Sequence, residues 1–346
     1  MNESILNLHP GILIGFAVTV IILLLLDLGI FNKKSHIISS KEATWWTIAW
    51  ISLSMIFSGV IYYIFNQDVG GHKLAIDKFT EYQAAYWIEK ALSVDNLFVF
   101  ILVFKFFKVP REFHHKVLFY GIIGALVFRA IFIFTGIGII NMTYLPSLEL
   151  LGETVRINVV LTLFGFFLLY AGIKSWGNKH ESENQDFSDS AGARLVKKLY
   201  KVSDGYDGDK FFTIQNGIRV ATPLMVVVSV IEFTDLIFAV DSIPAIFAIS
   251  SDPFILYTSN IFAIMGLRSL YFLLANFISK FSKLHYGLAF ILGFIGVKMI
   301  ISPWVHVPSP VSLGIVVGVL ILSVIVSFAF PEKVNLEVEE DKSQGK

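Results

Sequence analysis

Five acidic residues interrupt two long apolar stretches of this chain, and their type and spacing make them the best candidates for chemistry. Glu89 and Asp95 lie in the first stretch, and Glu232, Asp235 and Asp241 lie in the second. A charged side chain at the centre of a bilayer costs at least about 2.5 kcal/mol, so five of them cost on the order of 10 kcal/mol unless a cation or protons neutralise them. Ionisable residues inside membrane segments generally mark ion or proton pathways.

The chemistry open to these acids is coordination of a cation by oxygen. The chain has no cysteine, and its eight histidines lie at predicted helix ends or in loops. Oxygen ligands suit Mn²⁺, Ca²⁺ and Mg²⁺, whereas copper(I), zinc and nickel prefer sulfur or imidazole. An amide oxygen is available directly after Asp95. The predicted metal ligands are Glu89, Asp95, Asn96, Glu232, Asp235 and Asp241.

The spacing of the acids constrains the helices that carry them. Glu232 and Asp235 are three residues apart and therefore share a helix face. Glu89 and Asp95 are six residues apart, as are Asp235 and Asp241. That spacing separates the members of each pair by about 120° around a straight helix. Poor helix formers flank both aspartates: Ser93, Asn96, Ser242 and Pro244. The sequence therefore predicts a local break near each aspartate, which would free backbone carbonyls as further ligands.

Basic residues in apolar stretches offer a structural alternative, in which the acids only form buried ion pairs. Arg129 and Arg268 have two explanations, charge balance when no cation is bound or gating of the site, and charge balance is the preferred one. Asp27, late in the first apolar stretch, either lines an exit path or reaches the inner membrane surface. The clustering and duplication of the acids favour a functional site over the structural alternative. The bases available for pairing are Arg129, Arg268, Lys90, Lys174 and Lys298.

The elements that must position these residues are transmembrane helices. Only 16% of the 346 residues are charged and the mean hydropathy is +0.71, whereas soluble domains carry roughly a quarter charged residues. A helix needs about 20 apolar residues to span a bilayer, and about nine stretches of the chain meet that length. The predicted fold is therefore an all-α membrane protein. The predicted spans are 10–31, 43–65, 79–105, 116–140, 156–175, 218–248, 254–276, 285–302 and 310–330.

An internal repeat relates the third to fifth spans to the sixth to eighth. Each copy opens with an acid, four residues and then Val-Asp followed by Asn or Ser. An arginine recurs on the next span and a Gly-X-Lys on the third. Because the unit has three helices, an odd number, the second copy must be inverted in the membrane, with a site near the midplane between the copies. The matched positions are Glu89 with Asp235, Asp95 with Asp241, Arg129 with Arg268 and Gly172 with Gly296.

Lysine and arginine are concentrated in alternate loops, which predicts the orientation of the chain. The loops after the first, third, fifth and seventh spans are basic, so they are expected in the cytoplasm. The N-terminus is then outside, the C-terminus is cytoplasmic, and the expected location is the inner (plasma) membrane. The basic residues of these loops are Lys33, Lys34, Lys105, Lys108, Arg111, Lys116, Arg194, Lys197, Lys198, Lys201, Lys210, Lys280 and Lys283.

The predicted organisation is one transmembrane domain over residues 1–346. The first repeat covers 79–175, a cytoplasmic loop covers 176–217, and the second repeat covers 218–302. The loop contains the basic amphipathic segment Arg-Leu-Val-Lys-Lys-Leu-Tyr-Lys-Val. A solvated connector is the preferred interpretation of this loop, and a helix on the anionic inner leaflet is the alternative.

At the acidic motifs the sequence resembles the TerC/Alx family of integral membrane proteins, within the wider LysE-type transporter superfamily. The resemblance covers roughly residues 10 to 330. It implies manganese export, because bacterial relatives are associated with that activity, while the family name comes from tellurite resistance and a plant branch assists thylakoid assembly. The matching segments begin at Glu89, Gly121, Glu232 and Gly266.

The sequence and the resemblance together predict an exporter of divalent cations, Mn²⁺ foremost, that exchanges them for protons because metal and protons compete for carboxylates. The alternatives are a membrane assembly or stress-complex protein with a structural acid cluster, or an exporter of Ca²⁺ or another cation. No enzyme motif is present, and no cofactor beyond the transported cation is expected. The expected partners are the divalent cation and the lipid bilayer, not nucleic acid, and the sequence specifies no oligomeric state.

Overall fold

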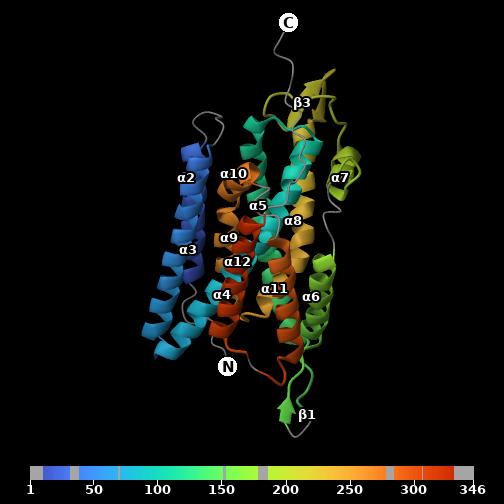
Figure 1. Ribbon diagram of the computed structural model, residues 1–346. Helices are drawn as coiled ribbons and strands as arrows, with labels where there is room; N and C mark the ends of the chain where they lie inside the picture. Colours follow the sequence, from blue (N-terminus) through green and yellow to red (C-terminus); the bar gives the residue numbers. More distant parts are fainter. Residues whose placement is uncertain are drawn as a thin grey trace.

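A bundle of long helices makes up most of the molecule in this computed structural model (Figure 1). The structure describes residues 11–31, 39–68, 71–150, 153–177, 186–277, 284–305 and 307–330. Two short antiparallel hairpins lie at opposite ends of the bundle, β1 (Leu148–Leu150) with β2 (Glu153–Val155), and β3 (Phe212–Gln215) with β4 (Ile218–Ala221). The helices are α2 (Gly11–Phe31), α3 (Ser40–Asp68), α4 (Gly71–Phe106), α5 (Arg111–Met142), α6 (Val159–Gly177), α7 (Ala191–Leu199), α8 (Pro223–Phe247), α9 (Pro253–Met265), α10 (Leu267–Phe277), α11 (Leu284–Ile301) and α12 (Ser309–Ala329).

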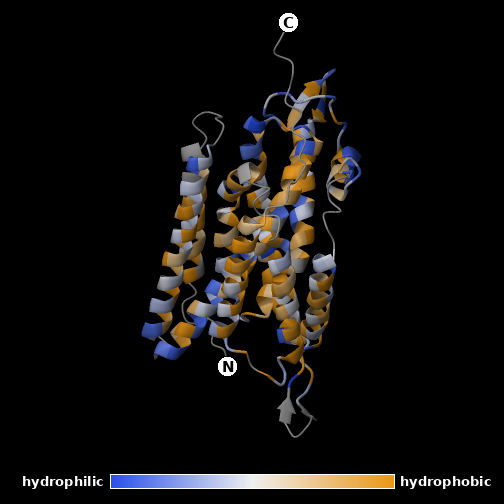
Figure 2. Ribbon diagram, in the orientation of Figure 1, coloured by the Kyte–Doolittle hydropathy of each residue, from blue (hydrophilic) through white to orange (hydrophobic). Residues whose placement is uncertain are grey.

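The all-α membrane fold is confirmed. Within the described residues, seven segments are long and apolar enough to cross a membrane: α3, α5, α6, α8, α9 together with α10, α11 and α12. Helix α4 is long as well but carries more charge than these, so the predicted count of nine spans stays a prediction. Large apolar side chains on the outer faces, such as Ile56, Ile131, Leu163 and Ile325, are more than half exposed. Hydrophilic residues gather toward the two ends of the bundle (Figure 2), as a lipid-embedded surface requires.

Helix α4 runs through the interior of the bundle. Its residues Tyr82, Ala84, Ala85, Tyr86 and Ile88 have no exposed surface. They pack against apolar side chains of α3, α5, α8, α9 and α11. The acid Glu89 follows this apolar segment directly and, like it, has no exposed surface.

The predicted breaks near Asp95 and Asp241 are wrong, because both helices are continuous there. Helix α4 extends to Phe106, and α8 ends only at Phe247. Pro244 lies in the last turn of α8, and although it provides no N–H for the carbonyl four residues earlier, the helix continues to Phe247. Ser93 donates a hydrogen bond to the Glu89 side chain at 3.3 Å instead of competing for the backbone. Helix propensity is a weak preference that packing overrides.

The break lies instead at Gly266, between α9 and α10. Lys90 on α4 donates a hydrogen bond from Nζ to the carbonyl of Ala263 at 3.2 Å. A cation placed at the last carbonyls of α9 satisfies them and opposes the helix dipole. A Cβ at position 266 would lie 2.6 Å from Lys90 Nζ and 3.1 Å from Trp50 Cβ. A larger residue at this junction would therefore force the Lys90 ammonium to move and disturb its hydrogen bond to Ala263.

Gly266→Ala is expected to destabilise the protein by about 1–3 kcal/mol, because the added methyl group must displace Lys90 or Trp50. The measurement is the thermal unfolding midpoint of the purified protein. Gly138→Ala is the matched control, since a Cβ at that helical glycine meets nothing within 4 Å. Equal midpoints for the two variants would contradict this account of the junction.

Helices α6 and α11 pack backbone to backbone through glycines. A Cβ at Gly172 would lie 2.7 Å from the carbonyl oxygen of Ala289, and a Cβ at Gly296 would lie 2.7 Å from that of Gly165. In the predicted repeat Gly172 is aligned with Gly296, and Gly165 then aligns with Ala289. The repeat operation thus converts one contact into the other, which is what a two-fold axis between the helices requires. This reciprocity favours the inverted repeat, which stays a prediction.

Part of the predicted 176–217 loop is folded onto the bundle. Helix α7 lies beside α8 in Figure 1, and Ser229 on α8 donates a hydrogen bond to the Gly192 carbonyl at 3.1 Å. The phenol of Tyr206 donates to the carbonyl of Phe107 at 2.8 Å, and Lys116 forms an ion pair with Asp209 at 2.8 Å. These contacts place the 186–222 segment at the same end of the bundle as the basic α4–α5 connection. The two loops therefore share a side, as the predicted topology requires.

Candidate functional site

A buried arginine joins two of the predicted acids. Arg129, on α5, is 1% exposed and forms ion pairs with Glu89 on α4 and with Asp235 on α8. The Asp235 pair has an N–O distance of 3.3 Å. Glu89 has no exposed surface, and Asp235 is 6% exposed. The first helices of the two predicted repeats therefore contribute one acid each to a single charged centre.

Asn260, which the sequence reasoning missed, completes this centre from α9. Its Nδ2 donates to Glu89 Oε2 at 3.0 Å, and its Oδ1 accepts from Arg129 Nη1 at 3.3 Å. Ser93 donates to Glu89 Oε1, so both carboxylate oxygens of Glu89 are satisfied. A buried charge is tolerable only when it is paired and hydrogen-bonded in this way. An asparagine within the long apolar run that begins at Pro253 was the signal available in the sequence.

Glu232 lies one helical turn from Asp235 and faces the backbone of α5. A Cβ at Gly124 would lie 2.0 Å from Glu232 Oε2, so the glycine makes room for the carboxylate. Glu232 Oε2 is buried, and no residue of the described part of the chain donates a hydrogen bond to it. An oxygen in this position can accept a cation or a proton, which fits its predicted role as a ligand.

Arg268 and Asp235 both line a small cavity of about 10 Å³, roughly the space that one water molecule needs. Arg268, on α10, is 2% exposed, and its Nη1 lies 2.9 Å from His115 Nε2. Gly121 and Ile231 also line this cavity. Asp235 thus pairs with Arg129 on α5 and shares a cavity with Arg268, which lies on α10 two residues after the break at Gly266.

Three predicted site residues have side chains outside the described part of the structure: Asp27, Asp95 and Asp241. Asn96 is described and is 4% exposed on α4. Among the side chains that the structure does describe, no three acids or histidines come close enough to hold a metal ion. The complete ligand set of Glu89, Asp95, Asn96, Glu232, Asp235 and Asp241 therefore stays a prediction.

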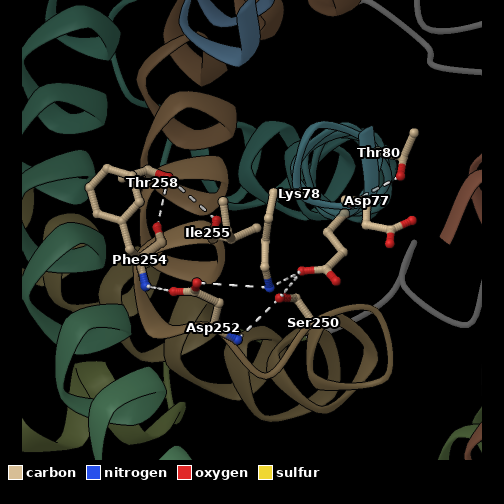
Figure 3. Close-up of polar contacts among 9 residues, drawn as sticks. Asp77, Lys78, Thr80, Ser250, Asp252, Phe254, Ile255 and Thr258 are labelled. Carbon is tan, nitrogen blue, oxygen red and sulfur yellow. Dashed lines mark hydrogen bonds and ion pairs between the residues drawn. The ribbon is translucent and has the colours of Figure 1, made fainter. Parts of the chain in front are cut away.

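A second buried polar cluster joins the start of α4 to the turn between α8 and α9 (Figure 3). Lys78 reaches from α4 to Glu81 at 2.9 Å and to Asp252 at 3.8 Å. Ser250 donates to Glu81 at 2.6 Å, and Asp252 caps α9 by accepting from the Phe254 N–H at 3.0 Å. Lys78 is 5% exposed and Asp252 is 4% exposed. The Lys78–Asp252 ion pair and the Ser250–Glu81 hydrogen bond thus join the α8–α9 turn to α4.

Lys78→Met is expected to lower stability by about 1–3 kcal/mol, because it removes the ammonium that pairs with the buried Asp252 and the partly buried Glu81. The thermal unfolding midpoint of the purified protein measures this loss. Lys73→Met, at an exposed position on the same helix, is the control. Equal unfolding midpoints for both variants and the wild type would show that this cluster does not stabilise the protein.

The comparisons with known proteins identify the family of this chain. The family model of the integral membrane protein TerC family matches residues 74–335. Alx of Escherichia coli K12, which carries the name of a membrane-bound redox modulator, is 41% identical over 314 residues, 90% of this chain and 92% of Alx. A membrane protein of Myxococcus xanthus is 39% identical over 318 residues, 92% of each chain. One from Rickettsia bellii is 38% identical over 312 residues, 90% of this chain and 95% of its own length.

No solved structure matches this chain. The family model spans every described residue of the charged centre, from Glu89 to Asn260, and the relatives are similar over nine-tenths of the chain. The chain is therefore a multi-pass membrane protein that belongs to the TerC family.

Proposed function

We propose that this protein exports divalent cations, Mn²⁺ foremost, through the centre formed by Glu89, Arg129 and Asp235. The supporting observation is that two buried acids from the two predicted repeats share one arginine. With both acids ionised, this trio carries one net negative charge inside the membrane. A cation is the natural partner for that charge, and the family resemblance supplies manganese and the outward direction.

Arg129 takes the role of a counter-ion in this proposal. It neutralises Glu89 and Asp235 when no cation is bound, which keeps the empty site tolerable in a low dielectric. An arriving cation competes with the guanidinium for the same oxygens. The carboxylate oxygens of Glu232, one helical turn from Asp235, are ligands that suit a divalent cation such as Mn²⁺. Protons compete for carboxylates in such an environment, which supports exchange of metal for protons.

The architecture supports alternating access about the charged centre. The reciprocal glycine contacts of α6 and α11 fit an inverted repeat, and in such transporters the substrate site lies between the copies. The proposed location is the inner membrane, with the N-terminus outside and the C-terminus in the cytoplasm. The α4–α5 connection and the 186–222 segment, both basic, lie at one end of the bundle, which supports this orientation.

A second candidate is a membrane assembly or stress-complex protein in which the acids are structural. The ion pairs of Arg129 favour it, because they show that the acids have a partner within the chain. The name of the Alx relatives suggests redox modulation. This chain has no cysteine, so a thiol–disulfide mechanism is not available to it.

The deciding experiment measures uptake of Mn²⁺, Ca²⁺, Mg²⁺ and Zn²⁺ by everted membrane vesicles that contain the protein, with and without a pH gradient. Export appears as uptake in everted vesicles. The proposal expects saturable Mn²⁺ uptake that exceeds uptake of the other ions and increases with the gradient. A preference for Ca²⁺ would identify a calcium exporter. Vesicles that contain abundant protein and accumulate no cation would favour the structural candidate.

A further inference from the structure

Helix α7 is fixed at a defined depth against a membrane-spanning helix. Ala193 and Val196 on α7 are 0% and 3% exposed and belong to the apolar core that includes Val226 and Val230 of α8. A Cβ at Gly192 would lie 2.4 Å from the Ser229 carbonyl oxygen, so the two backbones touch. The orientation of α7 about its own axis is therefore set by packing, and one face of the helix necessarily points away from the bundle.

That depth corresponds to the boundary between lipid headgroups and acyl chains. Ser229 is in the second turn of α8, which begins at Pro223, so it lies about 9 Å from the helix end. The 25 residues of α8 extend over about 37 Å, whereas the hydrocarbon core measures about 30 Å. The first turn of α8 thus lies among the headgroups, and α7 lies beside the point where the hydrocarbon begins.

The outward face of α7 combines apolar and basic side chains. Leu195 and Leu199 are 42% and 64% exposed and, being four residues apart, lie on one side of the helix. Arg194 and Lys198 form an adjacent exposed stripe, and Lys201 follows the helix. The segment 191–201 contains four basic residues and no acid. Exposed leucines beside a basic stripe are typical of helices that lie in the membrane interface.

We propose that α7 binds anionic phospholipid of the adjacent leaflet. The lipid phosphate contacts Arg194, Lys198 and Lys201, and the upper acyl chain covers Leu195 and Leu199. The choice of an anionic partner rests on charge complementarity, because the 191–201 segment has basic residues and no acid. Its packing against α8 holds these residues at the depth of the lipid headgroups. Lys197 is left out of the proposed lipid site, because its Nζ donates a hydrogen bond to the carbonyl of Ser188 at 2.7 Å. The inference does not depend on the cation chemistry proposed above.

Thermal unfolding of the full-length protein in neutral detergent provides the first test. Added phosphatidylglycerol is expected to raise the midpoint by several degrees, about 3–6 °C, while phosphatidylcholine does not, because only the anionic lipid binds the folded basic face. The variant Arg194→Gln/Lys198→Gln/Lys201→Gln is expected to lose this shift. The control Lys73→Gln/Arg156→Gln, with exposed basic residues outside α7, keeps it. An equal shift in the triple variant and the wild type would overturn the proposal.

Two further arms identify the source of the phosphate and guard against a variant that fails to fold. Glycerol phosphate alone is expected to give no shift; if it matches the lipid, α7 binds a soluble phosphate and the lipid proposal fails. In the natural cysteine-free background, Leu199→Cys carries a nitroxide in bilayers that contain phosphatidylglycerol. Greater accessibility to oxygen than to a water-soluble nickel complex is expected. The reverse order would place α7 in water, available to a soluble protein, and would refute lipid binding.

Discussion

Replacing Arg129 by glutamine is expected to reduce folded protein in the membrane severely. The change removes the cation that pairs with Glu89 and Asp235, which are 0% and 6% exposed. Breaking a buried ion pair by deleting one partner costs about 3–5 kcal/mol, because it leaves uncompensated charge in a low dielectric. The measurements are membrane abundance and the thermal unfolding midpoint. Arg156→Gln, at an exposed position on the β2–α6 connection, is the control.

The double variant Glu89→Gln/Arg129→Gln separates charge balance from shape. If Arg129 acts as a counter-ion, neutralising Glu89 removes one of the two uncompensated charges, leaves Asp235, and restores part of the abundance. If Arg129 is needed mainly for packing or hydrogen bonding, the double variant is as unstable as Arg129→Gln or worse. A stable, abundant Arg129→Gln single variant would contradict the counter-ion role altogether.

The sequence identified the charged centre because ionised groups are expensive in lipid. Glu89, Asp235 and Arg129 stand out in apolar stretches, and the structure brings these three together. Asn260 gives a weaker signal in its apolar run, because burying an uncharged amide costs far less than burying a charge. Its role depends on α9 crossing α4 at Glu89, a contact between residues 171 positions apart. No local pattern encodes such a contact.

Helix continuity was predicted less well than helix identity. Poor helix formers near Asp95 and Asp241 suggested breaks, but Ser93 turns its hydroxyl to Glu89 and both helices continue. The actual break at Gly266 depends on Lys90 and Trp50, which come from other helices. Repeat matching aligned Gly172 with Gly296, and their contacts are reciprocal, but the repeat itself stays a prediction. That both glycines are crossing points of α6 and α11 is a property of packing, which alignment alone does not reveal.

Neutralising either acid of the centre, by Glu89→Gln or Asp235→Asn, is expected to abolish cation export while the protein stays in the membrane. Each change keeps the shape of the side chain and lowers the negative charge of the trio to zero, so Arg129 alone balances what remains. The site then offers the cation one charged ligand fewer, while the Arg129 guanidinium still competes for the remaining carboxylate. We expect Mn²⁺ uptake by everted vesicles to fall at least about 10-fold, the lower range for losing an interaction that orients a metal ligand.

The same substitutions decide between the two candidate functions, provided that abundance is measured in parallel. An exporter whose acids are ligands loses manganese resistance and vesicle uptake at normal abundance, and Asp95→Asn and Asp241→Asn should behave alike. A structural acid cluster gives the opposite pattern, in which abundance changes and any activity per molecule does not. Ser93→Ala is the matched control, since it removes one 3.3 Å hydrogen bond to Glu89 but no charge. Abundant neutralised variants that transport at the wild-type rate would show that these carboxylates are not ligands, and the ion pairs of Arg129 would then be purely structural.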